Sequence, residues 1–144
     1  YAMTTGSRGL HVVAPLRRET GFDEVRALAR EMAARLAAHY PDELTVEQRK
    51  DQRGGRVYLD VMRNAYGQTT VLPYSVRARP GAPVAMPIDL AELDRRTLGP
   101  QGWHLGNAHR RLEKHGDPWA GLRRHATSAR KAGRVLAKLQ DSET

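Results

Sequence analysis

Residues 53–62 read RGGRVYLDVM and carry the clearest strand pattern in the chain. Side chains along a strand alternate between its two faces, so Val57, Leu59 and Val61 share one face. The polar stretch before them ends in a glycine pair and is typical of a connecting loop. The pattern therefore predicts a strand over residues 56–62.

Two further apolar runs on either side of this segment predict strands. Residues 10–16 (LHVVAPL) form the first run, and residues 69–76 (TTVLPYSV) form the second, which Pro73 interrupts. Residues 79–87 are rich in proline and glycine and therefore indicate a loop.

Helices account for most of the remaining sequence. Apolar residues recur at helical spacing over residues 22–40, where Thr20 and Asp23 resemble a capping box and Pro41 stops the run. Further helical segments are predicted over residues 90–96, 105–114 and 118–140. This order of elements predicts an α+β fold, a small mixed or antiparallel sheet with packed helices, in a single partial domain over residues 1–144.

The predicted C-terminal helix over residues 118–140 is amphipathic and basic. Its apolar stripe is expected to dock on the core, while its other side carries arginines and lysines from Arg123 to Lys138. Two interpretations of that basic side remain open at this stage: a solvated face, or a surface that meets DNA.

Composition excludes several classes of protein. The 144 residues include no cysteine, which rules out a disulfide scaffold, a cysteine-ligated zinc site, an iron–sulfur cluster and a thiol nucleophile. No apolar stretch is long enough for a membrane span, and no signal-peptide pattern opens the sequence, so a cytoplasmic protein without a membrane partner is expected. The net charge of +8 favours an anionic partner such as a nucleotide or a nucleic acid.

Asp60 and His11 are the first candidates for chemistry. A carboxylate in the middle of an apolar strand bears a desolvation cost unless a metal or another cation meets it, so Asp60 is a candidate metal ligand or catalytic residue. The alternative is an ion pair with Arg56 or Arg63. His11 alternates with apolar neighbours, and it would share a sheet face with Asp60 if their strands are adjacent; the alternative is a structural histidine.

Residues 4–11 (TTGSRGLH) form a third candidate feature. Glycines, hydroxyls and an arginine directly before a strand can present N–H groups and a guanidinium to a phosphate. The segment is neither a Walker A loop nor a dinucleotide fingerprint. A simple turn leading into a strand would have a similar composition.

Several strings taken together resemble one known family. Residues 5–11 (TGSRGLH) are followed by residues 53–60 (RGGRVYLD), residues 63–69 (RNAYGQT) and residues 73–83 (PYSVRARPGAP). These strings, together with Asp117-Pro118-Trp119-Ala120 near the C-terminus, resemble the polymerase domain of bacterial ligase D. That domain is a primase-polymerase of the archaeo-eukaryotic primase superfamily and acts in non-homologous end joining. The resemblance covers nearly the whole chain.

The resemblance implies roles for particular residues. The family's SGx[KR]GxH motif grips the triphosphate of the incoming nucleotide, and a family carboxylate that binds Mn²⁺ or Mg²⁺ matches Asp60. His11 is implied beside it as a catalytic candidate. The implied nucleotide-binding residues are Thr5 (in place of the usual serine), Gly6, Arg8, Gly9, His11, Arg53, Arg63 and Arg77. The implied partners are DNA ends, a nucleoside triphosphate, an attached ligase domain and Ku, with a location at the nucleoid.

The family's Asp-x-Asp motif has no counterpart in this sequence. The chain therefore corresponds to the C-terminal half of the family's domain, and its start at Tyr1 is expected to be that of a fragment. A two-metal site needs bridging carboxylates, so Asp60 by itself is expected to leave the chain without bound metal and inactive in nucleotide addition. The alternative is a non-catalytic module that binds nucleic acid or nucleotide. An exposed sheet edge is further expected to favour a homodimer.

Overall fold

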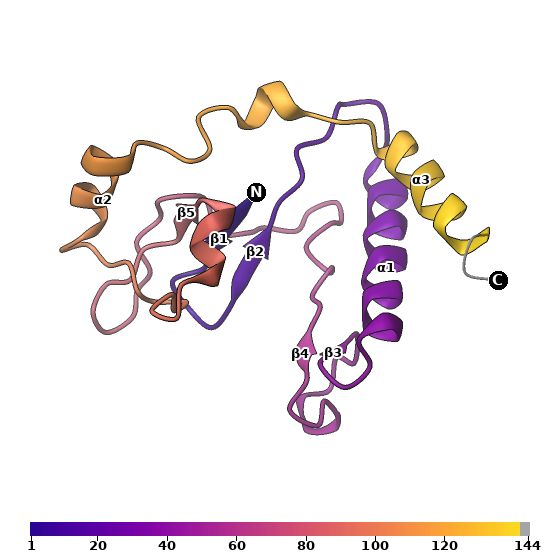
Figure 1. Ribbon diagram of the computed structural model, residues 1–144, viewed down its shortest axis with the longest axis horizontal. Helices are drawn as coiled ribbons and strands as arrows, with labels where there is room; N and C mark the ends of the chain where they lie inside the picture. Colours follow the sequence, from indigo (N-terminus) through magenta and orange to yellow (C-terminus); the bar gives the residue numbers. More distant parts are fainter. Residues whose placement is uncertain (142–144) are drawn as a thin grey trace. The chain divides into compact units, whose positions relative to one another are not determined.

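The computed structural model describes residues 1–141, and its elements divide into two compact units (Figure 1). The sheet unit comprises Tyr1–Pro15 and Val71–Ala126. The helical unit comprises Leu16–Thr70 and the described residues from Thr127 on. No helix among residues 1–141 has the length and apolar character that a membrane crossing requires.

The sheet unit is built on a three-stranded antiparallel sheet in the order β2-β1-β5. The central strand β1 (Ala2–Thr4) is buried, and it pairs with β2 (Leu10–Val12) on one side and with β5 (Met86–Ile88) on the other. Met3 lies opposite both His11 and Pro87. The strands β1 and β5 contribute to the hydrophobic core, whose buried members are Ala2, Val84, Met86 and Ile88. Tyr74 and Trp103 are among the half-buried side chains that pack against it.

Short helical segments complete the sheet unit. The 3-10 helix η2 (Leu90–Asp94) starts with a capping box in which the Asp89 side chain accepts a backbone N–H and Glu92 accepts the Asp89 N–H. Helix α2 (Ala108–His115) ends at Gly116, whose φ of 70° is accessible to glycine at little cost. The 3-10 helix η3 (Leu122–His125) follows.

The helical unit contains α1 (Phe22–His39) and α3 (Ala129–Asp141). These helices pack closely, because a Cβ at Gly133 would lie 4.0 Å from Leu28 Cδ1. Near the end of α1, β3 (Leu44–Thr45) pairs in parallel with β4 (Val57–Tyr58), and the 3-10 helix η1 (Lys50–Gln52) lies between them in sequence.

The predicted fold class is confirmed, but several boundaries differ. The predicted strand over 56–62 is only two residues long, and β5 lies partly within the predicted loop over 79–87. Pro87 is tolerated there because β5 is an edge strand. Residues 69–76 form no ladder strand; Tyr74 has a φ of 65°, which breaks the extended backbone, and only the isolated bridge between Val76 and Val84 remains.

The starts of two helices and the cap of a third also differ from their predictions. The predicted helix over 118–140 begins only at Ala129, where the Ser128 hydroxyl accepts the Lys131 N–H at 3.1 Å as a cap. The cap of α1 is Gly21, and no side chain caps it, so the predicted pairing of Thr20 with Asp23 does not form. The helix predicted over 105–114 begins at Ala108, after a turn that Asn107 closes by accepting the His104 N–H.

Candidate nucleotide-binding site

The turn between β1 and β2, residues 5–9, is held together by Thr5. Its hydroxyl donates to the Gly9 carbonyl oxygen at 2.9 Å and accepts the N–H groups of Ser7 at 3.2 Å and Gly9 at 3.3 Å. The Thr5 N–H also donates to the Gly9 carbonyl oxygen at 3.0 Å. Two N–H groups of the turn therefore point inward to the Thr5 hydroxyl and hold the shape of the turn.

Gly6 allows this turn to lie directly against a later segment of the chain. Its φ is +62°, and a Cβ at this position would meet Arg77 Cγ at 2.7 Å and the Val84 carbonyl carbon at 3.1 Å. Glycine is therefore required at this position for two reasons: the positive φ, and the close approach of Arg77 and Val84. Gly6 thereby brings the stem of Arg77 onto the turn.

Arg8 and Arg77 supply the positive charge of this region. Arg8 is exposed on the turn, and Arg77 is half-buried against Gly6. Within residues 1–141, neither guanidinium has an ion-pair or hydrogen-bond partner. Gln101 donates to the Ser7 carbonyl oxygen at 2.8 Å and supports the turn from outside. The arrangement offers one exposed guanidinium on the turn and a second, also uncompensated, on a side chain whose stem contacts the turn, which suits a phosphate-bearing anion.

His11 lies in the middle of β2 and is half-buried. The sheet unit thus holds six of the residues that the sequence singled out: Thr5, Gly6, Arg8, Gly9, His11 and Arg77.

The other three candidates, Asp60, Arg53 and Arg63, belong to the helical unit. Asp60 is exposed, follows β4 instead of lying within it, and accepts the Met62 N–H at 3.0 Å. Solvent therefore reaches the Asp60 carboxylate, and the carboxylate bears no desolvation cost that a metal or another cation would have to offset. The strand of His11 and the strand before Asp60 are not neighbours, because β2 and β4 belong to different sheets, so the condition for a shared sheet face is not met.

The expected alternative, an ion pair of Asp60 with an arginine, is not formed among residues 1–141. Arg56 donates to the Arg53 carbonyl oxygen at 2.8 Å, and Arg63 donates to Gln68 Oε1 at 3.0 Å. Among residues 1–141, the Met62 N–H is the one hydrogen-bond donor to the Asp60 carboxylate, so the charge of Asp60 stays available to solvent.

Arg53 shapes the loop that precedes β4. It donates to the carbonyl oxygens of Glu47 at 3.0 Å and Gln48 at 2.7 Å, and its Cζ lies 4.1 Å from the centre of the Tyr58 ring. The guanidinium is thus already engaged with protein groups on two sides, unlike those of Arg8 and Arg77.

The acidic residues do not complete a metal site. No group of three or more His, Cys, Asp or Glu side chains that could hold a metal ion exists among residues 1–141. Asp60 offers a single carboxylate, whereas a two-metal site needs several. The donor set of the described chain therefore does not fit the divalent cation that the family resemblance implies.

The segment after α2 contributes residues to which sequence reasoning gave no role. The Tyr74 hydroxyl donates to the Asp117 carboxylate, and Trp119 Nε1 donates to the Ala2 carbonyl oxygen at 3.1 Å. Burial, and then the hydrogen bond to Asp117, raise the pKa of Tyr74 far above its ordinary value. These bonds fasten residues 117–119 to β1 and to the loop that leads to Arg77. The signal in the sequence was the string Asp117-Pro118-Trp119.

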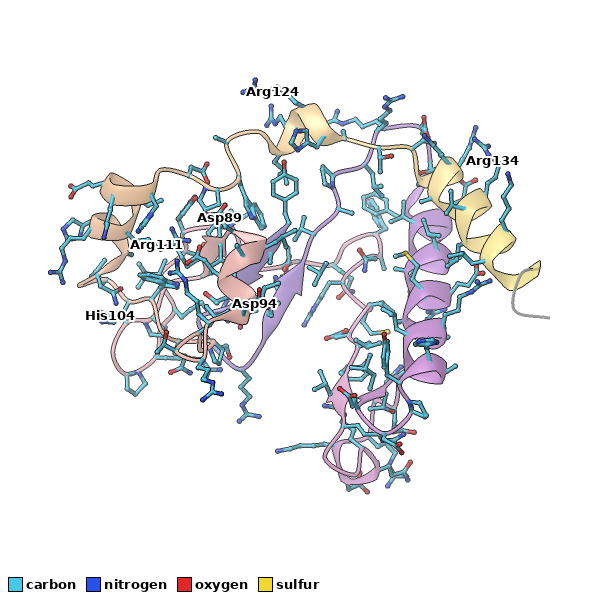
Figure 2. All side chains as sticks on the ribbon, viewed as in Figure 1. Asp89, Asp94, His104, Arg111, Arg124 and Arg134 are labelled. Carbon is cyan, nitrogen blue, oxygen red and sulfur yellow. The ribbon has the colours of Figure 1, made fainter. Side chains whose placement is uncertain are left out.

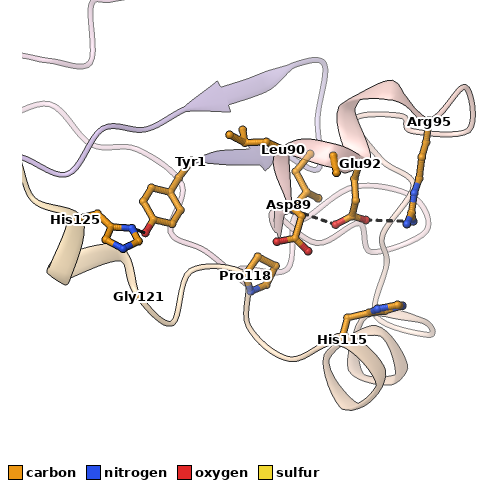
Figure 3. Close-up of a pocket in the computed structure, with 11 residues that line it drawn as sticks. Tyr1, Asp89, Leu90, Glu92, Arg95, His115, Pro118, Gly121 and His125 are labelled. Atoms are coloured by element: carbon orange, nitrogen blue, oxygen red, sulfur yellow. Dashed lines mark hydrogen bonds and ion pairs between the residues drawn. The ribbon is translucent and has the colours of Figure 1, made fainter.

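A pocket of about 760 Å³ lies elsewhere in the sheet unit (Figure 3). Its lining includes Tyr1, Asp89, Arg95, His115 and His125, and the Tyr1 hydroxyl is 2.6 Å from His125 Nδ1. None of the candidate nucleotide-binding residues lines this pocket. The candidate site is therefore the turn with its two arginines, not the pocket.

The chain has a mixed α/β fold, and its sheet unit carries an arginine-bearing turn as a candidate anion site. Residues 1–119 match the family described as LigD, primase-polymerase domain, and the chain belongs to that family. The family predicted from the sequence is thereby confirmed.

Named relatives and a solved structure agree with this assignment. The multifunctional non-homologous end joining protein LigD of Pseudomonas aeruginosa is 37% identical over 122 residues, which are 83% of this chain and 14% of that protein. The corresponding DNA repair protein of Mycobacterium tuberculosis is 37% identical over 94 residues, 65% of this chain and 12% of that protein. The polymerase domain from Mycobacterium tuberculosis ligase D, solved in complex with DNA, matches with a TM-score of 0.79 and 34% identity over 87% of this chain and 43% of that chain. The chain thus spans about one seventh of the Pseudomonas relative.

Proposed function

We propose that this chain grips the triphosphate of an incoming nucleotide for a repair polymerase that adds nucleotides to DNA 3′ ends in non-homologous end joining. The observation that carries the proposal is the turn over residues 5–9, with Arg8 on it and Arg77 packed against it, both without a partner among residues 1–141. The names of the relatives, which refer to end joining, support the same process.

The proposed role of the turn follows from its charges. Phosphoryl transfer spreads negative charge over the phosphate oxygens, and fixed cations stabilise that charge without reorganisation. Arg8 supplies one such cation on an exposed side chain, and Arg77 supplies another on a half-buried side chain. Thr5 and Gly6 hold the turn in the conformation that brings these two arginines together with the start of β2. His11, Arg53 and Arg63 are proposed as further contacts to nucleotide or template, and Ku and a ligase domain as partners of the parent protein.

Replacing Arg8 with glutamine tests the proposed grip directly. A charge-assisted hydrogen bond contributes about 1.5–3 kcal/mol, so the affinity for a nucleoside triphosphate should fall about 10- to 150-fold. Titration of a fluorescent triphosphate measures this change. Arg18→Gln removes the same charge from an exposed position in the helical unit and should leave the affinity within about twofold. Equal affinities of the Arg8 variant and the unmodified chain would sink the proposal.

Primer extension by the 144-residue chain should yield no added nucleotide with either Mn²⁺ or Mg²⁺. The reason is that Asp60 is the one carboxylate proposed for the metal, and the described residues form no group of three or more His, Cys, Asp or Glu side chains around it. The assay uses a labelled primer with a 3′ overhang and the chain at high concentration. Metal-dependent extension that disappears in an Asp60→Asn variant would contradict this expectation and would make Asp60 part of a complete site.

A further inference from the structure

Helix α3 carries a basic face that no part of the proposed nucleotide site uses. The helix begins at Ala129, ten residues beyond the last residue that the family match covers. From Ala129 to Leu139 it contains four cationic side chains and no acidic one. The cations are Arg130, Lys131, Arg134 and Lys138, and all four are exposed.

The four cations gather on the side of α3 opposite its packed side. Ala129 is buried, and Ala132, Gly133 and Leu136 are half-buried, with Gly133 directly over Leu28 of α1. At about 100° per residue, the four cations fall within an arc of about 100°, centred nearly opposite these residues. Figure 2 shows Arg134 on the side of α3 that is turned away from α1.

Asp141, the last residue of α3, is the one acidic residue of this helix; among residues 1–139, whose side chains are described, no acidic group neutralises the cationic face. Within residues 1–139, none of the four cations forms an ion pair or side-chain hydrogen bond. Arg134 lies four residues from both Arg130 and Lys138, and three from Lys131. Like charges at these spacings repel and destabilise an isolated helix. An anion bound along the face would remove that repulsion.

We propose that this face of α3 binds the phosphate backbone of DNA, independently of base sequence. The inference rests on the proposed function, which brings the chain to DNA ends. Arg130, Arg134 and Lys138 form a row about 12 Å long, since an α-helix rises about 1.5 Å per residue. A DNA strand offers a phosphate about every 3.4 Å of axis, so the row spans three to four phosphates. A membrane surface suits it less, because the apolar side of α3 is already packed on α1.

The salt dependence of DNA binding tests this proposal. The test variant replaces the four cations together: Arg130→Gln, Lys131→Gln, Arg134→Gln and Lys138→Gln. Each phosphate contact adds about 0.9 to the slope of log affinity against log salt, so four contacts add about 3.6. Between 50 and 200 mM salt, the affinity of the unmodified chain should therefore fall about 150-fold more than that of the variant. Fluorescence anisotropy of a labelled duplex with a 3′ overhang measures both curves.

Two controls make the result specific to this face. Arg110→Gln, Lys114→Gln, Arg123→Gln and Arg124→Gln together remove the same charge from exposed positions in the sheet unit and should change the slope by less than one. Arg130→Lys with Arg134→Lys keeps the charge and should keep the slope. Glutamine is a good helix former, so circular dichroism should show α3 intact.

The outcomes separate this proposal from the nucleotide site. A test variant with the slope of the unmodified chain would overturn the proposal and would direct attention to an acidic protein partner. An equal change in the sheet-unit control would overturn it as well, because net charge would then explain the effect. The triphosphate affinity of the test variant should stay within about twofold of that of the unmodified chain. If the proposed nucleotide site is wrong, the triphosphate titration will show it, whereas the salt dependence of the DNA affinity will be unaffected.

Discussion

Replacing Gly6 with alanine should destabilise the sheet unit by about 2–5 kcal/mol and abolish measurable triphosphate binding. The left-handed backbone costs a residue with a Cβ about 1–2 kcal/mol. The new methyl group would meet Arg77 Cγ at 2.7 Å and the backbone of Val84 at 3.1 Å, and overpacking of this kind costs about 1–3 kcal/mol. The contact also displaces Arg77, so affinity should fall more than stability alone would require. Urea unfolding and triphosphate titration measure the two effects.

Gly9 provides the matched control within the same turn. A Cβ at Gly9 would meet no atom within 4 Å, and no left-handed φ is found there. Gly9→Ala should therefore change the free energy of unfolding by less than about 0.5 kcal/mol. Equal stability of the two alanine variants would show that the contact between Gly6 and Arg77 does not constrain the turn.

Replacing Arg111 with methionine should destabilise the sheet unit by about 3 kcal/mol, the low end for a broken buried pair, because among the described residues Glu92 then keeps only the largely exposed Arg95 as a cation, 3.5 Å away. The Arg111 side chain is 2% exposed and the Glu92 side chain 9% exposed, and the two form an ion pair. Glu92 also accepts the Asp89 N–H at 3.0 Å, and the Arg111 guanidinium lies 4.9 Å from the centre of the Trp103 ring. One pair thus joins η2 to α2 and to the core beside β5. Urea unfolding followed by tryptophan fluorescence measures the loss.

A double variant distinguishes the buried charge from the packing around it. Glu92→Gln combined with Arg111→Met removes both charges, while the glutamine can still accept the Asp89 N–H. The double variant should recover most of the stability that the single variant loses, since the buried carboxylate charge is then gone. A single variant that loses less than about 1 kcal/mol, or a double variant that recovers nothing, would assign the stability of this region to packing.

Local sequence was sufficient where one segment decides its own structure. The apolar spacing over residues 22–40 predicts α1 almost to the residue, because a helix makes its hydrogen bonds within itself. A turn before a strand was one of the two interpretations of residues 4–11, and it too is local: Thr5 closes it through Ser7 and Gly9, which are only two and four residues away. The family was also readable from the strings that begin at Thr5 and Arg53.

Strands and caps were less predictable, because their partners lie far away in sequence. β1 is three residues long, and it is a strand because it lies between β2 and β5, the second of which is more than eighty residues away. The alternating run over residues 56–62 has the right pattern but pairs only at Val57 and Tyr58, because β3 is two residues long. The alternation of apolar residues predicts which face a strand can bury. Whether the strand forms depends on hydrogen bonds to a neighbouring strand.

The candidate site shows the same division. The sequence by itself determined the fold class, the family, the cationic excess and the chemical character of the turn at Thr5–Gly9. Only the tertiary structure decided that Arg77 lies on Gly6, that Arg53 is engaged by carbonyl oxygens, and that Asp60 is exposed beyond its strand. The physical reason is that composition fixes which groups are available, whereas burial and hydrogen-bond partners depend on which distant segments meet.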